Sequence, residues 1–480
     1  MPGLFGVLDV AGRGLLAAQR GVHVTGHNIA NANTPGYSAQ RQILGNAFPI
    51  VHSAGLLGTG VEQITVERLH DAFVQTQLLR QGGSFGSTRA QAEALSQIEE
   101  VLNEQDADGV ATVISRLYDS FSDLASAAAP GASVEREALR GSAQSLIDTF
   151  HAFDGQLREL QGSADRAIRD VVPEVNEFLV RIQELNEEIV RQETVAPAND
   201  MRDLRDQAVR DLALLVDVST YETGDGALVV TLSSGLPLVE GGSARTLVAQ
   251  ADPTHPFDPT YVQVRYQDGA NDLDVTADLG GGRLGGLLRA RDTHYASAIR
   301  SLDTIAYNLA ASVNSVHQLG TGLDGSVGDF FAAPAAVADA ARGLALDASV
   351  LATPDAIAAG LGGGPSDNRN ALALADLRHA ATTLFLPGDP PGPASGPSRT
   401  LLQHVGAVVG DIGQQARSLN LAQGQQARVL EGLENRRDQV AGVSIDEEVT
   451  RLIRLQAAFQ ANSRVVVVVD ELLDDVLRMI

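Results

Sequence analysis

Two stretches bracket this sequence: LFGVLDVAGRGLLAAQRGVHVTGHNI, residues 4–29, and IDEEVTRLIRLQAAFQANSRVVVVVDELLDDVLRMI, residues 445–480. In both stretches, mostly apolar residues recur at alternating steps of four and three positions. That spacing keeps a narrow stripe on one side of an α-helix, as paired helices require. We therefore predict two long terminal helices that pair, in a protein built for assembly rather than catalysis. The stripe positions are Leu4, Leu8, Ala11, Leu15, Ala18, Val22, Thr25 and Ile29, then Ile445, Val449, Leu452, Gln456, Phe459, Ser463, Val466, Asp470, Leu473, Leu477 and Ile480.

The composition limits what the chain can be. Its 480 residues suffice for about three domains, and 44% of them are hydrophobic while only 4% are aromatic. The formal charge is −25, from 35 basic and 60 acidic residues. Nucleic acids and anionic membranes bind clustered positive charge, so we expect neither as a partner.

The absence of Cys excludes disulfides, thiolate nucleophiles and Cys-bound metals. No apolar run approaches the ~20 residues of a membrane-spanning helix, so we expect no membrane insertion. A secretory signal has a basic start and a continuous apolar segment, whereas the first apolar residues here alternate with Gly, Gln and Arg. If the protein leaves the cell, it uses another route.

Changes in periodicity divide the chain into nested parts. Helical spacing is predicted for most of residues 66–216 and again for 284–318 and 400–440, with an extended or loop conformation over 43–66. Within 66–216 we expect helix over 66–81 and breaks near Asp106–Gly109, Pro130–Gly131 and Ala196–Asp200. Between Val216 and Tyr266, short runs of β-forming residues alternate with turn residues.

The predicted fold is mainly α with a β-rich insert. We expect a terminal coiled coil formed by residues 1–35 plus 443–480. A central helical bundle would comprise 36–216 plus 283–442, with an irregular segment at 320–398, and a small outer β domain would comprise 217–282. The nesting predicts paired ends at one pole of an elongated molecule and the β domain at the other.

One glycine motif could indicate a nucleotide site. Gly280–Gly285 fits G-x-G-x-x-G, follows a strand-like Val275–Leu279 and precedes a helix, and Asp303 lies 18 positions further on. No second strand is predicted after that helix, and a strand–helix–strand unit is what places a cofactor. The motif therefore favours a strand-to-helix joint, and a nucleotide-dependent enzyme is kept as an alternative.

Two other motifs are weaker. Gly82–Gly86 fits the G-x-S-x-G of a nucleophile elbow, but helix rather than strand is predicted before it. His23 and His27 share a helix face without a third ligand, which favours an interface or solvent role over a metal site. We predict no catalytic, metal-binding or cofactor-binding residues and no cofactor.

The turn after the first helix, NIANANTPGYS (residues 28–38), resembles the N-terminal signature of bacterial flagellar rod, hook and hook-associated proteins. Residues Asp446–Arg464 and Asp470–Leu473 resemble the C-terminal signature of that family. Three features resemble its hook-associated members at the junction of hook and filament: the Gly-Tyr-Ser end of the first motif, Gly285–Asp292 and Gly364–Leu374. The resemblance covers the chain except for roughly residues 217–275. The chain is short for the family, as if a variable outer domain were reduced or absent.

This resemblance implies a non-enzymatic structural adaptor that joins hook to filament by subunit polymerisation. It implies export by the flagellar type III system and a location outside the cell, in the bacterial flagellum, without a cleavable signal peptide. The implied partners are copies of the same chain in a ring or helical layer, the hook protein, a filament-side hook-associated protein, and an export chaperone for the C-terminal helix. The alternative within the family is another axial protein, such as hook or distal-rod protein.

The resemblance also implies that the terminal helices line the inner tube of the axial structure while the β-rich domain faces outward. One departure from the family pattern is the run Val465–Val469, which predicts either a deeper seam between subunits or an aggregation hazard in the free monomer. The residues expected at the assembly interface are Leu4, Leu8, Leu15, Val22, Asn28, Ile29, Asn31, Asn33, Pro35, Gly36, Tyr37, Ile445, Val449, Leu452, Phe459, Val466, Leu473 and Leu477.

Overall fold

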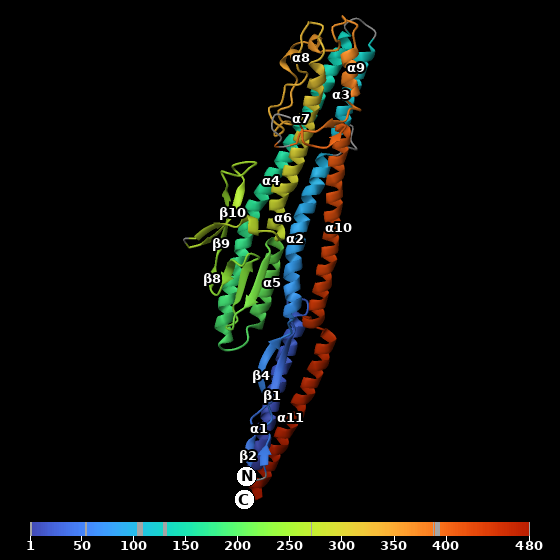
Figure 1. Cartoon of the computed structure of the whole chain (residues 1–480). Helices are drawn as coiled ribbons and strands as arrows, with labels where there is room; N and C mark the ends of the chain where they lie inside the picture. Colours follow the sequence, from blue (N-terminus) through green and yellow to red (C-terminus); the bar gives the residue numbers. More distant parts are fainter. Residues whose placement is uncertain are drawn as a thin grey trace.

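Long helices set the shape of the molecule (Figure 1). The computed structural model describes residues 2–52, 55–102, 109–127, 132–269, 271–386, 388 and 394–479. The long helices are α1 (Pro2–Asn31), α2 (Ala72–Val101), α3 (Val110–Ser126), α4 (Ser133–Glu193), α5 (Asn199–Leu215), α7 (Ala296–His317), α10 (Leu401–Ala441) and α11 (Ile445–Met479). The short ones are η1 (Thr276–Asp278), α6 (Gly282–Arg289), the π-helical turn η2 (Ala290–Tyr295), α8 (Ala348–Ala352), η3 (Pro354–Ala356) and α9 (Arg369–Asp376). No described helix is long and apolar enough to span a membrane.

The strands form small antiparallel sheets. Near the start of the chain, β1 (Gln40–Asn46) pairs with β4 (Val61–Arg68), and β2 (Ile50–His52) pairs with β3 (Gly55–Leu57) at the tip of the same hairpin. The β-rich insert contains a sheet of order β5-β6-β7-β8 and a sheet of order β11-β10-β9. Their strands are β5 (Val218–Glu222), β6 (Leu228–Leu232), β7 (Pro237–Glu240), β8 (Ser243–Ala244), β9 (Thr246–Ala251), β10 (Val262–Asp268) and β11 (Asn271–Asp274), and a further pair is β12 (Thr382–Thr383) with β13 (Ser398–Arg399).

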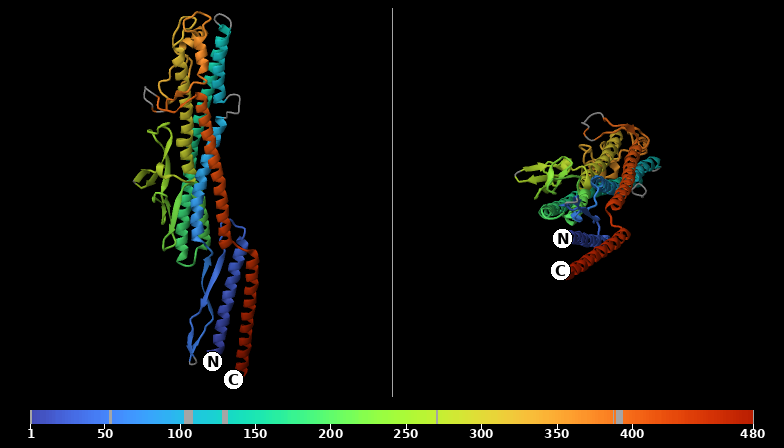
Figure 2. Two further views of the ribbon diagram at one scale, coloured as in Figure 1. Left: turned by 45° about the vertical axis from the view of Figure 1, so that its right-hand side comes forward. Right: turned by 90° about the horizontal axis from the view of Figure 1, so that it is seen from below.

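The predicted mainly α fold with a β-rich insert and paired terminal helices is confirmed. Helix α1 lies along α11, and both chain ends reach the same pole (Figures 1 and 2). We call α1, the β1–β4 hairpin and α11 the terminal unit, and the remainder the body. The body has two hydrophobic cores, and neither includes a described residue of the terminal unit. The terminal unit is therefore held together by narrow seams rather than by a core of its own.

We predicted the insert at the far pole, but it does not lie there. Its two sheets lie against the side of α4 and α5, at mid-length of the molecule (Figure 1). Apolar residues of β6 and β10, such as Val230 and Val264, share one core with Ile182 of α4 and Leu212 of α5, which holds the insert to the helices. The far pole is formed instead by α3, α8, α9 and much of the irregular segment 320–398 (Figure 1).

One predicted helix boundary is wrong. The helix expected from Val66 begins at Ala72, because β4 continues to Arg68 and Asp71 caps the helix by accepting the backbone N–H groups of Phe73 and Val74. The hairpin preceding it packs on α1, so we propose to group residues 36–71 with the terminal helices rather than with the bundle. The break predicted near Ala196 separates α4 from α5. The breaks predicted at 106–109 and 130–131 lie largely outside the described residues.

Candidate assembly surface and its joint to the body

Small side chains form the seam between α1 and α11. The buried or half-buried positions Ala11, Gly14, Ala18, Gly21 and Thr25 of α1 again recur at steps of three and four, and Gly14 and Gly21 face α11. A methyl group added at Gly14 would lie 2.8 Å from the Asn462 amide, and one added at Gly21 would lie 2.8 Å from Leu455. These two pairs also show that the helices run antiparallel. Missing side chains on α1 thus let the two backbones approach closely.

The seam on α11 lies one residue away from much of the predicted stripe. Leu452, Val466 and Leu473 are half-buried, as the stripe predicts. The alternate seam positions, however, are Glu448, Leu455, Asn462, Val469 and Val476. Of the predicted alternates, Val449, Gln456, Asp470 and Leu477 are exposed, and Ser463 is half-buried. The first set is the more apolar, so pairing along it buries more apolar area. Polar breaks at Gln456 and Asp470 therefore do not interrupt the seam, and Val469 is its most buried apolar residue at 3% exposure.

The other stripe residues lie beside the seam or face solvent. On α1, Leu4, Leu8, Leu15, Val22 and Ile29 are half-buried at its flanks. On α11, Ile445, Val449, Phe459 and Leu477 are exposed, and Leu477 is 70% exposed. Ile480 lies outside the described residues. The exposed set stays available to a neighbour, as an assembly interface requires.

Large apolar side chains gather on the outside of the terminal unit. Besides the stripe residues, the exposed ones are Phe5, Val7, Val10 and Leu16 on α1; Leu44, Phe48, Ile50, Val51, Leu56, Leu57 and Ile64 on the hairpin; and Ile453, Val465, Val467, Val468 and Leu472 on α11. Contiguous exposed apolar surface of this kind marks a protein–protein contact in soluble proteins.

The Asn-rich turn is organised around Asn28, which is fully buried. Its side-chain oxygen accepts the hydroxyl of Tyr37 at 2.8 Å and the backbone N–H of Gln40 at 3.0 Å, while its amide donates to the Gln40 carbonyl at 2.9 Å. The end of α1 is thereby fixed to the start of β1. Asn31 extends this network by donating to the His27 carbonyl at 3.1 Å.

The remaining turn residues shape its outer surface. Gly36 has φ +83°, and a methyl group there would lie 3.0 Å from the Gln207 side chain, so both the conformation and the close approach favour Gly. Tyr37 is half-buried, and burial, with the nearby Asp200, raises the pKa of its phenol well above the usual value. Asn33 and Pro35 are exposed and line a groove between this turn and the link from α10 to α11.

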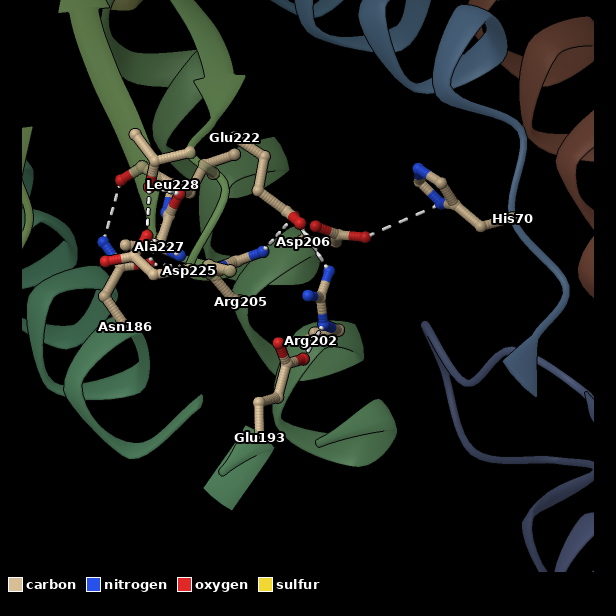
Figure 3. Close-up of polar contacts among 12 residues, drawn as sticks. His70, Asn186, Glu193, Arg202, Arg205, Asp206, Glu222, Asp225, Ala227 and Leu228 are labelled. Atoms are coloured by element: carbon tan, nitrogen blue, oxygen red, sulfur yellow. Dashed lines mark hydrogen bonds and ion pairs between the residues drawn. The ribbon is translucent and has the colours of Figure 1, made fainter. Parts of the chain in front are cut away.

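Acidic residues of α5 anchor the terminal unit to the body. Arg68, at the end of β4, forms ion pairs of 2.9 Å with Asp203 and 2.7 Å with Asp206. Asp203 also accepts the backbone N–H of Ser38 at 2.8 Å. His70 lies 3.8 Å from Asp206 (Figure 3), and burial, then the charge of Arg68, lowers its pKa. These partners are largely buried, so they fix the orientation of the terminal unit relative to α5.

The same helix holds the β insert through its arginines. Arg205 is fully buried and donates to Glu222, Asn186 and the Gly226 carbonyl, each within 2.9 Å. Arg202 joins Glu222 to Glu193 at the end of α4 (Figure 3). Helix α5 thus connects the terminal unit, the long helix α4 and the insert.

The glycine motifs turn out to be packing sites. Residues 276–278 before Gly280–Gly285 form a 3-10 turn instead of the expected strand, and Gly282, at φ +65°, lies against the backbone of Leu215. Gly82–Gly86 lies inside α2, where a methyl group at Gly86 would lie 2.2 Å from the Leu214 carbonyl oxygen. Gly86, Gly282 and Gly285 each lie against the backbone of another segment, so in both motifs glycine allows close packing.

The histidines of α1 likewise gather no metal ligands. His27 contacts the Tyr37 hydroxyl at 3.0 Å and Asp200 at 3.6 Å, while His23 is exposed. Across the described residues, no three His, Asp or Glu side chains are grouped so as to bind a metal ion.

Sequence reasoning missed two parts of this surface. The sequence predicts only an extended or loop conformation over residues 43–66, although residues 42–61 contain no Asp, Glu or Arg in a chain with 20% charged residues. That charge-free run is the signal that could have identified the apolar hairpin. The acids Asp203 and Asp206 gave no signal, since their partners lie 135 or more positions away.

Comparison with known proteins agrees with this architecture. Residues 95–331 match the domain family described as "Flagellar hook-associated protein FlgK helical domain". Residues 438–479 match "Flagellar basal body rod FlgEFG protein C-terminal", and residues 8–37 match "Flagella basal body rod protein".

Flagellar hook-associated protein 1 of Bacillus subtilis is 28% identical over 99% of this chain and 98% of its own length. The chain belongs to the hook-associated protein 1 family. Its Escherichia coli relative of that name is 26% identical over 98% of this chain and 99% of its own length.

A solved structure has the same fold. The flagellar hook junction protein FlgK of Burkholderia pseudomallei superposes with a TM-score of 0.65, at 17% identity, over 76% of this chain and 100% of that structure. The full-length sequence similarities above confirm the predicted family, and the terminal helices lie in the two segments that match rod-protein families.

Proposed function

We propose that this chain is the structural adaptor that joins the hook to the filament of a bacterial flagellum, and that it works by ordered polymerisation without catalysing a reaction. The single observation that carries the proposal is the terminal unit, which has no core of its own and exposes apolar side chains on both its helices and its hairpin. Such a unit is marginal in isolation and gains stability when copies bury these surfaces. Full-length similarity to hook-associated proteins supports the location.

The proposal includes the route and the partners. A terminal unit without a core unfolds at low cost, which suits export through the narrow channel of the flagellar type III system. The assembled partners would be copies of this chain, hook protein on one side and a filament-side hook-associated protein on the other. Before export, a chaperone would cover the apolar face of α11. The interface residues proposed from the sequence and the exposed residues of the hairpin would form the contacts.

A truncation tests the mechanism. Deleting residues 445–480 removes α11 but no member of either body core. We expect a folded, soluble body with a cooperative thermal transition that does not restore filaments to a strain lacking the gene. Electron microscopy should then show hooks without filaments, with flagellin shed into the medium. A truncated chain that restores swimming would contradict the proposal.

Two alternatives remain distinguishable. The matches to rod-protein families at both ends fit another axial protein, such as hook or distal-rod protein. The order of attachment separates them, because a junction protein binds finished hooks and then accepts filament-side subunits. A nucleotide-dependent enzyme is disfavoured by the packing of Gly280–Gly285, and calorimetry with NAD or ATP should show no binding.

A further inference from the structure

The terminal unit has two apolar outer faces, one on each side of α1. The hairpin covers one side of α1 and α11 covers the other (Figure 2). The tip of the hairpin exposes Phe48 at 93%, Val51 at 81% and Leu56 at 71%. On α11, the run Val465–Val469 exposes Val467 at 55% and Val468 at 52%. Both surfaces are open to a partner.

The two faces also match in charge. Residues 42–61 of the hairpin contain no acidic or basic side chain apart from His52, and Leu455–Val469 of α11 contain only Arg464. The chain as a whole is acidic, with a formal charge of −25. Two apolar strips whose one formal charge, on Arg464, is exposed can bury one another with little loss of charge solvation. A hydrophilic or charged partner would lose solvation at either strip.

The faces lie at the same height along the unit. A methyl group at Gly60 would lie 3.3 Å from the Val10 Cα, and Thr59 donates to the Phe48 carbonyl at 2.6 Å, so Phe48, at the base of the tip, is level with Val10. Because Gly14 faces Asn462 and the helices are antiparallel, Val10, one turn earlier, is level with Val466. Phe48 and the valine run therefore lie at the same height, on opposite sides of α1.

This geometry suits a head-to-tail contact. Subunits related by rotation about an axis parallel to their helices join different surfaces of successive copies, and those surfaces must lie at matching heights. This proposal rests on the proposed polymerisation: we propose that the hairpin tip around Phe48 of one copy packs against the exposed Val465, Val467 and Val468 of the next copy. The exposed valines of this run are then the receiving surface of the contact between copies.

Cross-linking tests this contact directly, because the chain has no Cys and each introduced thiol is unique. Flagella are prepared from cells that express Phe48→Cys and Val467→Cys variants together, and a short bismaleimide is added. We expect a cross-linked dimer only when both variants are present, with mass spectrometry joining the peptides that contain positions 48 and 467. Replacing Val467→Cys by Val195→Cys, an exposed position on the body, should give no dimer.

The outcomes separate this contact from the adaptor function. If the Cys variants carry filaments yet give no 48–467 link, or if position 48 links to a chain of another sequence, the proposed contact is wrong and the adaptor role stands. If the wild-type gene fails to attach filaments in the deletion strain, the adaptor role is wrong.

As a second measurement, Phe48→Asp and Val467→Asp should each lower the number of filaments per cell at least tenfold, whereas Val195→Asp leaves it unchanged.

Discussion

At the scale of single residues, the joint depends on one arginine. Arg68 neutralises Asp203 and Asp206, whose side chains are 7% and 12% exposed. Replacing Arg68 by Met leaves two buried carboxylates unpaired, which typically costs ~3–5 kcal/mol. We expect amide hydrogen exchange in β1 and β4 to accelerate about 100-fold or more, while exchange in the α4 core stays unchanged. The control is Arg89→Met, whose partner Glu93 is 59% exposed and whose loss should cost under ~1 kcal/mol. Unchanged exchange in β1 and β4 would show that Arg68 does not anchor the unit.

A buried histidine at the far pole makes stability depend on pH. His317 is fully buried; its Nδ1 lies 2.7 Å from the Gly328 carbonyl, and its Nε2 accepts the backbone N–H of Ala358 at 2.9 Å. A carbonyl can only accept, so the proton is on Nδ1 and the ring is neutral. Burial, the largest cause, lowers its pKa below the usual value.

The sign of the pH effect follows from that lowered pKa. Unfolded His317 takes up a proton near pH ~6.5, whereas folded His317 takes it up only at lower pH, so the stability is full above ~6.5 and falls as the pH drops towards the folded value. We expect the midpoint of urea unfolding to fall between pH 7 and pH 5. The fall should be smaller in His317→Asn, which has no titrating ring. Equal slopes in the two proteins would rule out this histidine as a source of the dependence.

At the scale of elements, the sequence predicted the terminal helices well and their facing surfaces only in part. On α11, a repeat of four and three residues allows two stripes, the predicted one and the observed seam. Both include the positions of Leu452, Phe459, Val466 and Leu473. Which stripe faces the partner helix α1 depends on where α1 carries small residues. A search for apolar residues overlooks glycines, so the sequence pattern did not reveal those positions. The hairpin was missed for a related reason: its two strands stay together by packing on α1, which local sequence does not encode. The turn around Asn28 was located correctly, but its anchor on α5 is a long-range contact.

The small-residue seam gives a matched pair of substitutions within one helix. A Leu at Gly14 would point at Asn462 and force α11 away, whereas Gly12 has open space around it. We expect Gly14→Leu to expose the seam, seen as stronger binding of a hydrophobic dye and faster proteolysis of α11. Gly12→Leu should leave both measurements at the wild-type level or slow the proteolysis, because Leu favours helix over Gly. Equal behaviour of the two variants would contradict the close approach at Gly14.

At the scale of the whole molecule, charge is divided unevenly. Residues 1–71 carry four acids and four arginines, and residues 443–480 carry seven acids and four arginines, so the terminal segments have a net charge of −3 and the remainder −22. Bodies of neighbouring copies would therefore repel one another, while the contact proposed between their terminal units is apolar. Salt screens the repulsion, with a Debye length falling from about 10 Å at 0.1 M to 3 Å at 1 M, and leaves apolar contacts intact or stronger.

This division predicts the salt dependence of self-association. At a fixed protein concentration, raising NaCl from 0.05 M to 0.5 M should increase the fraction of the chain that sediments as oligomers. In Phe48→Asp the increase should be smaller, because a charge then lies in the apolar contact, whereas Val195→Asp should behave like the wild type. Analytical ultracentrifugation at both salt concentrations provides the measurement. If association weakens as salt rises, ion pairs rather than apolar faces hold the copies together, and the division of charge between body and terminal unit does not govern assembly.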